Sequence, residues 1–316
     1  MTRRGGRAAP AGAGGPTANL GELRWCRSAT LEGNTTVTGT TKVIGIIGDP
    51  VSHSLSPQLH NAAFEACGLD IVYVPLPVGA RAVGAAVQGL AALGLRGANV
   101  TIPHKGAVVP YLSWLDDDAR LLKAVNTIVV DGDEMRGYNT DVEGVRGSLE
   151  EAEGAGLHGA TGLVFGAGGA GRAAALALAR MGVRVTIVNR TAAAAERLAA
   201  LISAAVPGAG CRWLALSDLT AAEVVAQRVV VNATPLGMAG AGKVPAPLVD
   251  TVTAGQVVFD VVYTGGETEL LAQARARGAN VVDGLRMLVR QAAVAFELWT
   301  GERAPLKVMQ DAIARR

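Results

Sequence analysis

Polar side chains that could bind a small molecule gather in four short stretches of the first half of the chain, residues 54–57, 99–105, 126–127 and 139–141. They supply hydroxyls, amides, one lysine and one carboxylate, and each stretch lies at the end of an apolar run that predicts a strand, or in a neighbouring loop. In open α/β sheets, ligands bind at the carboxyl ends of the strands. This set of groups suits a small polyol that carries a carboxylate.

Lys105 and Asp141 are the charged residues that stand out in these stretches. When a hydride is transferred to a ketone carbon, negative charge develops on the oxygen, and a nearby ammonium can stabilise that charge and deliver a proton. A carboxylate can orient the ammonium and accept a hydrogen bond from a neighbouring hydroxyl. The residues alone leave simpler roles open, because most lysines are exposed and an aspartate at a helix start is often an N-cap.

Gly166, Gly168 and Gly171 follow a short apolar strand and open a predicted helix. In that context, glycines let the backbone turn tightly and approach a pyrophosphate, to which the amides of the helix start can donate. Glycines 154, 156 and 159 have the same spacing but precede a strand, so we interpret them as a chance match. The first set predicts a dinucleotide site, and the alternative is a tight strand-to-helix turn without a ligand.

The end of the next predicted strand indicates which dinucleotide is bound. An NAD site usually has an acidic residue about 20 positions after the glycines, where it binds the ribose 2′-hydroxyl. This chain has Asn189, Arg190 and Thr191 there. A guanidinium can bind a 2′-phosphate through two hydrogen bonds, whereas a carboxylate would repel it. The sequence therefore favours NADP, and the alternative is that Arg190 is an ordinary surface residue.

Apolar runs and turn residues predict the elements that position these groups. Expected strands are residues 43–47, 71–77, 98–102, 126–130, 134–138, 163–165, 183–188, 229–231, 257–262 and 280–282. Expected helices are residues 80–93, 116–123, 170–181, 191–205, 269–277, 285–299 and 306–314, with further helices beginning at Ser56, as N-cap, and at Asp141. This alternation indicates an α/β protein with a mostly parallel sheet that is covered on both faces.

Composition and charge exclude several classes of protein. Half of the residues are apolar and 18% are charged, unlike a disordered chain. Five arginines and two glutamates among residues 1–41 give this segment a surplus of three positive charges, so the remainder is close to −1. We expect this Gly/Pro/Ala-rich segment to be a disordered extension. Because the basic surplus lies there, and because no run of 18 apolar residues occurs, we predict neither nucleic-acid binding nor membrane insertion.

The cysteines and histidines form no metal-binding or disulfide pattern. Cys26, Cys67 and Cys211 are scattered and odd in number, and the four histidines lack the spacing of metal ligands. Unpaired cysteines suit a reducing compartment. We therefore expect a cytoplasmic protein without a metal site.

The four polar stretches and the glycine loop together resemble the shikimate dehydrogenase family, and the resemblance covers residues 42–316, including Tyr263 and residues 283–291. It implies two α/β domains that flank a cleft. Residues 42–144 form the substrate-binding catalytic domain, completed by the C-terminal helices of residues 285–316, and residues 145–284 form a Rossmann-type NADP domain. It also implies the reversible NADPH-dependent reduction of 3-dehydroshikimate to shikimate, a step towards the aromatic amino acids.

The resemblance also implies a role for each of the matching residues. Lys105 and Asp141 match the catalytic pair. The substrate carboxylate is expected to bind Ser54, Ser56 and Tyr263, and the ring hydroxyls Thr101, Asn126 and Gln291. The residues expected to bind the cofactor are Gly166, Ala167, Gly168, Gly169, Ala170, Gly171, Asn189, Arg190, Thr191, Val261 and Gly284. His104 occupies a position that varies in the family, so we expect it to be structural.

One departure from the family pattern weakens the case for strict NADP selectivity. A second basic residue often follows the adenosine-phosphate motif, whereas this chain has Ala194. A quinate or aminoshikimate dehydrogenase that uses NAD is therefore an alternative, although relatives that accept quinate often replace the second serine, here Ser56, with threonine. A non-catalytic NADP-binding regulator would be expected to lack Lys105 or Asp141. The oligomeric state, a homodimer included, stays open.

Overall fold

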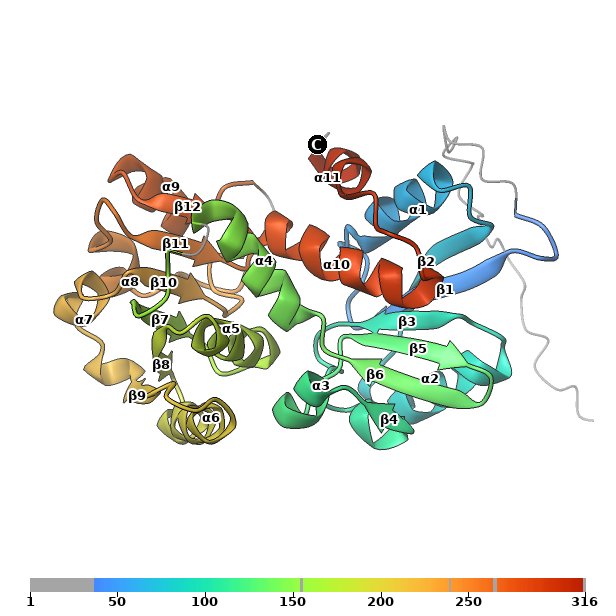
Figure 1. The fold of residues 1–316 in the computed structure, drawn as a ribbon, viewed down its shortest axis with the longest axis horizontal. Coiled ribbons are helices and arrows are strands. Elements are labelled where there is room, and N and C mark those ends of the chain that lie inside the picture. Colours follow the sequence, from blue (N-terminus) through green and yellow to red (C-terminus); the bar gives the residue numbers. More distant parts are fainter. Residues whose placement is uncertain (1–36, 154–155, 239, 264–265, 315–316) are drawn as a thin grey trace, which may run out of the picture. The chain divides into compact units, whose positions relative to one another are not determined.

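The computed structural model describes residues 37–153, 156–238, 240–263 and 266–314, which contain two six-stranded sheets (Figure 1). The first sheet has the strand order β2-β1-β3-β5-β6-β4. Its strands are β1 (Lys42–Gly48), β2 (Ile71–Pro77), β3 (Gly97–Val100), β4 (Trp114–Leu115), β5 (Thr127–Asp131) and β6 (Glu134–Tyr138).

The first sheet mixes parallel and antiparallel pairs. β1 pairs in parallel with β2 and β3, whereas β5 is antiparallel to both β3 and β6. β5 and β6 form the predicted hairpin, in which Gly132 has a φ of 60° that glycine adopts without strain. Asn99 pairs with Thr127, and Thr127 pairs with Tyr138. The end of β3, the start of β5 and the end of β6 therefore lie side by side, and three of the four polar stretches meet there.

Helices cover both faces of the first sheet. They are α1 (Ser56–Ala66), α2 (Val83–Ala92), α3 (Asp117–Leu122), α10 (Gly284–Thr300) and α11 (Leu306–Ala314), with 3₁₀ turns η1 (Ala80–Ala82) and η2 (Val109–Tyr111). One core joins Ile46 of the sheet to Leu59 of α1 and Phe296 of α10. A second core joins Ile47 to Val87 of α2. Adjacent strand residues thus face opposite cores, as the twofold period of a strand requires.

The second sheet is parallel throughout, with the order β12-β11-β10-β7-β8-β9. Its strands are β7 (Thr161–Phe165), β8 (Arg184–Asn189), β9 (Arg212–Ala215), β10 (Val229–Asn232), β11 (Val257–Asp260) and β12 (Asn280–Val282). The strands after β7 first extend to one edge, and β10 then continues the sheet on the other side of β7. Such a reversal is where ligands bind in doubly wound sheets, so β7 and β10 mark the expected dinucleotide site.

The second sheet is also covered on both faces. The helices are α4 (Asp141–Glu153), α5 (Gly169–Arg180), α6 (Ala192–Ala205), α7 (Ala221–Val225), α8 (Ala246–Asp250) and α9 (Glu269–Ala276), with η3 (Leu216–Asp218). Val164 of β7 packs in one core with residues of α4, α5 and α6. Its neighbours Leu163 and Phe165 pack in another core with residues of α7, α8 and α9. The predicted α/β architecture with two domains is thereby confirmed.

Several predicted boundaries differ from the structure. β3 ends at Val100, and Ile102, predicted to belong to that strand, is exposed. The helix predicted for residues 80–93 is divided into η1 and α2, and β11 ends at Asp260 rather than at residue 262. The strands β4 and β9 and the short helices α7 and α8 were not predicted.

The predicted extension, residues 1–41, lies mostly outside the described residues. Its last five residues, 37–41, are described and form a turn before β1. Thr41 N–H donates to Thr38 O at 3.3 Å, and the Thr40 hydroxyl donates to Asp70 Oδ2 at 2.7 Å. These contacts fix the chain before Lys42. Within the described part of the chain, no helix is both long and apolar enough to cross a membrane.

Candidate active site

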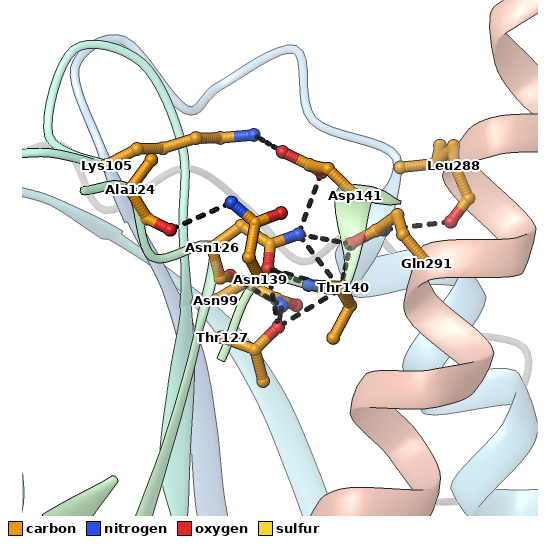
Figure 2. Close-up of polar contacts among 10 residues, drawn as sticks. All are labelled: Asn99, Lys105, Ala124, Asn126, Thr127, Asn139, Thr140, Asp141, Leu288 and Gln291. Atoms are coloured by element: carbon orange, nitrogen blue, oxygen red, sulfur yellow. Dashed lines mark hydrogen bonds and ion pairs between the residues drawn. The ribbon is translucent and has the colours of Figure 1, made fainter. Parts of the chain in front are cut away.

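Lys105 and Asp141 form an ion pair, in which Lys105 Nζ lies 2.5 Å from Asp141 Oδ2 (Figure 2). Lys105 lies in the turn after β3, where the buried His104 bonds through Nε2 to Val78 O at 2.5 Å and Val125 N–H donates to Lys105 O at 2.8 Å. Asp141 is the first residue of α4. The aspartate side chain is only 5% exposed and the lysine side chain 20%, so the ammonium is the more accessible partner.

The Asn126 amide holds the Asp141 carboxylate from its other side (Figure 2). Asp141 Oδ1 accepts from Asn126 Nδ2 at 2.8 Å, and the backbone N–H of Thr140 donates to Asn126 Oδ1 at 2.8 Å, which fixes the amide orientation. Asn126 Nδ2 also lies 3.2 Å from Gln291 Oε1, and Gln291 Nε2 donates to Leu288 O at 2.8 Å. The start of β5, the start of α4 and the middle of α10 therefore meet at one buried network.

Asn99, Thr127 and Thr140 also belong to this network; they lie in the polar stretches of the sequence, but no individual role was predicted for them. Thr140 Oγ1 accepts from Asn126 Nδ2 at 2.9 Å. Asn99 donates to Asn126 O at 3.1 Å and to Thr127 Oγ1 at 3.0 Å, while its Oδ1 accepts from the Tyr73 hydroxyl at 2.6 Å. Their place at strand ends was the available signal. Amides and hydroxyls at strand ends also satisfy backbone groups, so this signal did not separate the two roles.

The structure corrects the role predicted for Ser56 at the start of α1. Ser56 is the first residue of the helix rather than its N-cap, which is Leu55, and no side chain caps this end. The Ser54 hydroxyl instead accepts from the Ser56 N–H at 3.2 Å, so the first serine orders the turn. Burial raises the pKa of Tyr73, and a hydrogen bond with Ser56 opposes that rise. Ser56 is thereby linked through Tyr73 to the network around Asn99.

Tyr263 and Thr101 are placed differently with respect to this network. Tyr263 packs against the core that joins α1 and α10, and burial raises the pKa of its phenol, with a smaller contribution from the negative charge of Asp141. Thr101 follows β3 and donates its N–H to Ile47 O at 2.9 Å. Its methyl group lies against Gly48, where a Cβ would come within 2.4 Å of it. Among the residues described, the Thr101 hydroxyl has no hydrogen-bond partner.

The glycine loop between β7 and α5 has room for a ligand at one position and none at the other two. Gly166 has a φ of 115°, which other residues rarely adopt. A Cβ at Gly171 would lie 2.1 Å from Gly166 O, so helix and strand pack more closely than a side chain allows. A Cβ at Gly168 would meet nothing within 4 Å. Gly168 is the N-cap of α5 and supplies no side-chain cap, so the amides of Gly169, Ala170 and Gly171 are available to an anion.

The polar residues after β8 lie beside this loop. Asn189 Oδ1 accepts from Ala167 N–H at 3.2 Å, and Asn189 Nδ2 donates to Thr191 O at 3.1 Å. Arg190 is exposed and forms no ion pair within the described chain. Thr191 is the N-cap of α6, and its hydroxyl makes no capping bond. An unpaired guanidinium at a helix N-terminus is a favourable place for the 2′-phosphate of NADP.

Two contacts involve the predicted cofactor residues: one joins Gly284 to Val261, and the other joins Gly169 to Lys105. A Cβ at Gly284 would lie 2.3 Å from Val261 O, so only glycine fits at the start of α10. A Cβ at Gly169 would lie 3.3 Å from Lys105 Cδ, which shows that the aliphatic part of the lysine lies against the glycine loop. The Lys105–Asp141 pair and the predicted dinucleotide site are therefore adjacent. Of the other glycine match, Gly154 lies outside the described residues, and Gly156 and Gly159 precede β7.

No group of three or more His, Cys, Asp or Glu side chains in the described ranges could hold a metal ion. The polar groups next to the glycine loop are instead an ammonium, a carboxylate, amides and hydroxyls.

A parallel dinucleotide-binding sheet joined to a mixed sheet that carries a lysine–aspartate pair defines a dinucleotide-dependent oxidoreductase with two α/β domains. Residues 46–128 match the model of the shikimate dehydrogenase substrate binding domain, and residues 284–314 match the shikimate 5′-dehydrogenase C-terminal domain. The chain belongs to the shikimate dehydrogenase family.

Known proteins resemble the chain over most of its length. A shikimate dehydrogenase (NADP(+)) from Salinibacter ruber is 47% identical over 278 residues, which cover 87% of this chain and 97% of that protein. A shikimate dehydrogenase solved in complex with NADP+ has a TM-score of 0.82 at 40% identity, covering 88% of this chain and 96% of that chain. Quinate dehydrogenase from Corynebacterium glutamicum, solved in complex with NAD, has a TM-score of 0.80 at 35% identity, covering 87% and 99% respectively.

Proposed function

We propose that this protein catalyses the reversible NADPH-dependent reduction of 3-dehydroshikimate to shikimate. The observation that carries the proposal is the Lys105–Asp141 ion pair, held by Asn126 and placed against the glycine loop. The name of the Salinibacter ruber relative, shikimate dehydrogenase (NADP(+)), supports the substrate and the cofactor. Residues 42–144 with 285–316 would form the substrate domain and residues 145–284 the NADP domain, and the packing of α10 and α11 on the first sheet supports this division.

The catalytic pair would act on the substrate oxygen. NADPH, when bound, supplies the hydride for the ketone carbon. The Lys105 ammonium stabilises the negative charge that develops on the oxygen and donates a proton to it, and in the reverse direction the amine takes that proton back. Asp141 keeps the ammonium in place through Oδ2 and accepts from a neighbouring ring hydroxyl. Its second oxygen is already held by Asn126, so the carboxylate is oriented before substrate arrives.

The remaining polar residues would bind the substrate around this pair. Ser54, Ser56 and Tyr263 are assigned to the carboxylate, and Thr101, Asn126 and Gln291 to the ring hydroxyls. The Thr101 hydroxyl, which has no hydrogen-bond partner among the described residues, and the packing of Tyr263 against the core of α10 support these roles.

The cofactor would bind at the carboxyl end of β7. The open space at Gly168 and the uncapped amides of α5 suit a pyrophosphate, and Val261 and Gly284, which lie against each other, would complete the cofactor site. Arg190 and Thr191 would hold the 2′-phosphate of NADP. Asn189 would keep them beside the glycine loop, because its side chain bonds to both Ala167 and Thr191.

A quinate dehydrogenase that uses NAD is the second candidate. Ala194 favours it, because it supplies no second cation next to Arg190. The structural similarity to quinate dehydrogenase in complex with NAD supports the same fold for that activity.

A spectrophotometric assay of the purified full chain decides between the two candidates. Nicotinamide absorbance is followed with shikimate and with quinate, each with NADP and with NAD, and Lys105→Ala purified in parallel controls for a contaminating host enzyme. The highest kcat/KM is expected for shikimate with NADP. A higher kcat/KM for quinate with NAD would replace the proposal with the second candidate. Light scattering of the same sample distinguishes a monomer from a homodimer.

We also place the protein in the cytoplasm. The two described cysteines, Cys67 and Cys211, are free thiols, which suits a reducing compartment. Fractionation of the source cells with an antibody to the protein tests this location.

A further inference from the structure

Asp260, the last residue of β11, is a buried carboxylate that the proposed reaction does not use. Its Oδ1 accepts from Asn232 Nδ2 at 2.9 Å and from Val262 N–H at 3.1 Å, and its Oδ2 accepts from the Thr268 hydroxyl at 2.7 Å. All three donors are neutral, and no cationic side chain of the described chain pairs with it. Burial raises the pKa of Asp260 to about 6, which reflects the cost of a charge without a cation.

The three hydrogen bonds of Asp260 join three separate segments at the carboxyl ends of the strands of the second sheet. Asn232 ends β10, and it also holds the turn that follows: its Nδ2 donates to Leu236 O at 3.0 Å, and its Oδ1 accepts from the Thr234 hydroxyl at 2.7 Å. Val262 lies in the turn after β11. Thr268 is the N-cap of α9. One carboxylate therefore fixes the end of β10, the turn after β11 and the start of α9.

The residues on both sides of Val262 are assigned to the reaction. Val261 contacts Gly284 through its carbonyl, and its N–H donates to Asn232 O at 3.0 Å. Tyr263 packs against the core that contains Leu288 and Val289 of α10, the helix that also carries Gln291. A movement of the turn at Val262 would therefore shift a cofactor residue and a substrate residue together.

We propose that Asp260 is a positioning residue, which sets Val261 against the cofactor and Tyr263 against the substrate by holding the turn between them. The inference rests on the proposed function for what Val261 and Tyr263 bind. It does not make Asp260 a catalytic residue, because the carboxylate is fully buried behind the turn and satisfied by protein donors.

The test compares Asp260→Ala with Asp260→Asn. Alanine removes all three acceptor contacts, so the KM for shikimate is expected to rise about tenfold or more, with a smaller fall in kcat. Asparagine can keep them, because its oxygen can accept from Asn232 and Val262 and its amide can donate to the Thr268 hydroxyl. Asp260→Asn is therefore expected to recover the KM to within about twofold. Equal KM values in Asp260→Ala and the wild type would overturn the proposal.

A double-mutant cycle separates positioning from general loss of structure. If Asp260 acts through Tyr263, Asp260→Ala should raise the KM much less in a Tyr263→Phe background than in the wild type. An undiminished rise would overturn the proposal. Should Asp260→Ala fail to fold, Thr268→Val removes one of the three bonds and should raise the KM in the same direction. Thr161→Val is the matched control. The Thr161 hydroxyl donates to Ala226 O at the amino ends of the strands of the same sheet, away from the proposed site, so this variant should leave the KM unchanged.

Hydrogen exchange gives a readout that does not depend on the substrate. The peptide that contains Val262 should exchange faster in Asp260→Ala and at the wild-type rate in Asp260→Asn. Unchanged exchange in Asp260→Ala would overturn the positioning role even in an active enzyme. A wild-type protein that does not turn over shikimate, but shows this exchange pattern, would overturn the proposed function and leave the positioning of the turn supported.

Discussion

At the scale of single residues, the ion pair at the site is asymmetric in its surroundings. Asp141 is held through both oxygens, by Lys105 and by Asn126, whereas Lys105 has one protein partner and keeps a fifth of its side chain exposed. An ammonium with remaining donors can reach a ligand oxygen without leaving its carboxylate. This geometry explains why the lysine, rather than the aspartate, is the group expected to meet the developing charge.

Lys105→Ala is predicted to lower kcat by about a hundredfold or more while the KM for shikimate changes little, because the contact strengthens only as charge develops in the transition state. Steady-state kinetics measure both constants. Lys307→Ala serves as the control, since Lys307 is an exposed lysine of α11 paired with Asp311. A preserved kcat with a raised KM would make Lys105 a binding residue.

His60 is a buried residue that should make the stability of the protein sensitive to acid. It is fully buried and stacks on Tyr73 with ring centroids 4.6 Å apart, with Trp299 edge-on at 5.2 Å. Within the described structure neither ring nitrogen has a hydrogen-bond partner. Burial lowers the pKa of His60 from 6.5 to about 3. Between these values the unfolded chain binds a proton that the folded protein does not.

The contribution of His60 to the free energy of unfolding should therefore fall as the pH drops below 6.5, by about 1.4 kcal/mol per pH unit, until the pH approaches 3. Asp260, whose pKa burial raises from 3.8 to about 6, contributes in the opposite direction between those two values, so the His60 contribution is measured as the difference between wild type and a His60 variant. Above pH 6.5 the His60 contribution is constant. His60→Phe should flatten this part of the pH dependence, whereas His53→Gln, a change at an exposed histidine, should retain it. Urea unfolding at pH values between 4.5 and 7.5 measures the slope, and equal slopes in wild type and His60→Phe would contradict the assignment.

At the scale of elements, the junction of β8 and α6 should decide the cofactor preference. Arg190 is the cation at this strand end, Ala194 follows it without a charge, and the N-terminus of α6 adds its own positive end. Arg190→Ala is expected to lower kcat/KM for NADP by about tenfold or more and to leave the value for NAD nearly unchanged. Arg197→Ala, at an exposed arginine further along α6, is the control. A variant that keeps the wild-type preference for NADP would show that another group binds the 2′-phosphate.

Long elements with a buried face were readable from the sequence, whereas the five-residue helices α7 and α8 and the strands without a buried face were not. The strand predicted for residues 71–77 and the helix predicted for residues 306–314 match β2 and α11. The missed strands β4 and β9 lie at the sheet edges and contain no buried residue, so no apolar alternation marks them. They form because a neighbouring strand supplies hydrogen-bond partners. Ser56 was misplaced for a similar reason, because serine suits both an N-cap and the first turn.

The site was predictable as a set of strand ends but not as a network. Polar residues after β3 and beside the β5–β6 hairpin indicated where a ligand would bind, whereas the pairing of Asn126 with Asp141 depends on the antiparallel register of β5 and β6. Gln291 lies 165 residues from Asn126, so only the family resemblance placed it at the site. The role of Asp260 could not be predicted from the sequence, because an aspartate at the end of a strand is equally consistent with an exposed surface residue.

At the scale of the whole molecule, α10 packs a late part of the chain onto the first sheet, whose strands lie within residues 42–138. Trp299 is fully buried, and its indole Nε1 donates to Ile128 O of β5 at 2.9 Å. Trp299→Ala is predicted to lower the free energy of unfolding by about 3–5 kcal/mol, since it leaves a cavity and an unpaired carbonyl. Trp213→Ala, at an exposed tryptophan of β9, should change it little. Denaturant unfolding measures both, and equal losses would argue against the division of domains proposed above.

Because α10 packs on the first sheet, it also determines the order in which the two domains can finish folding during synthesis. Residues 42–138 leave the ribosome first, yet the apolar face of their sheet that Phe296 covers stays bare until the last helices emerge. The second sheet has all of its strands by residue 282 and can close earlier. We therefore expect the half of the protein that is made first to mature last. Gln291 arrives with that final segment, so a nascent chain interrupted after β12 could hold a dinucleotide but would lack part of its substrate site.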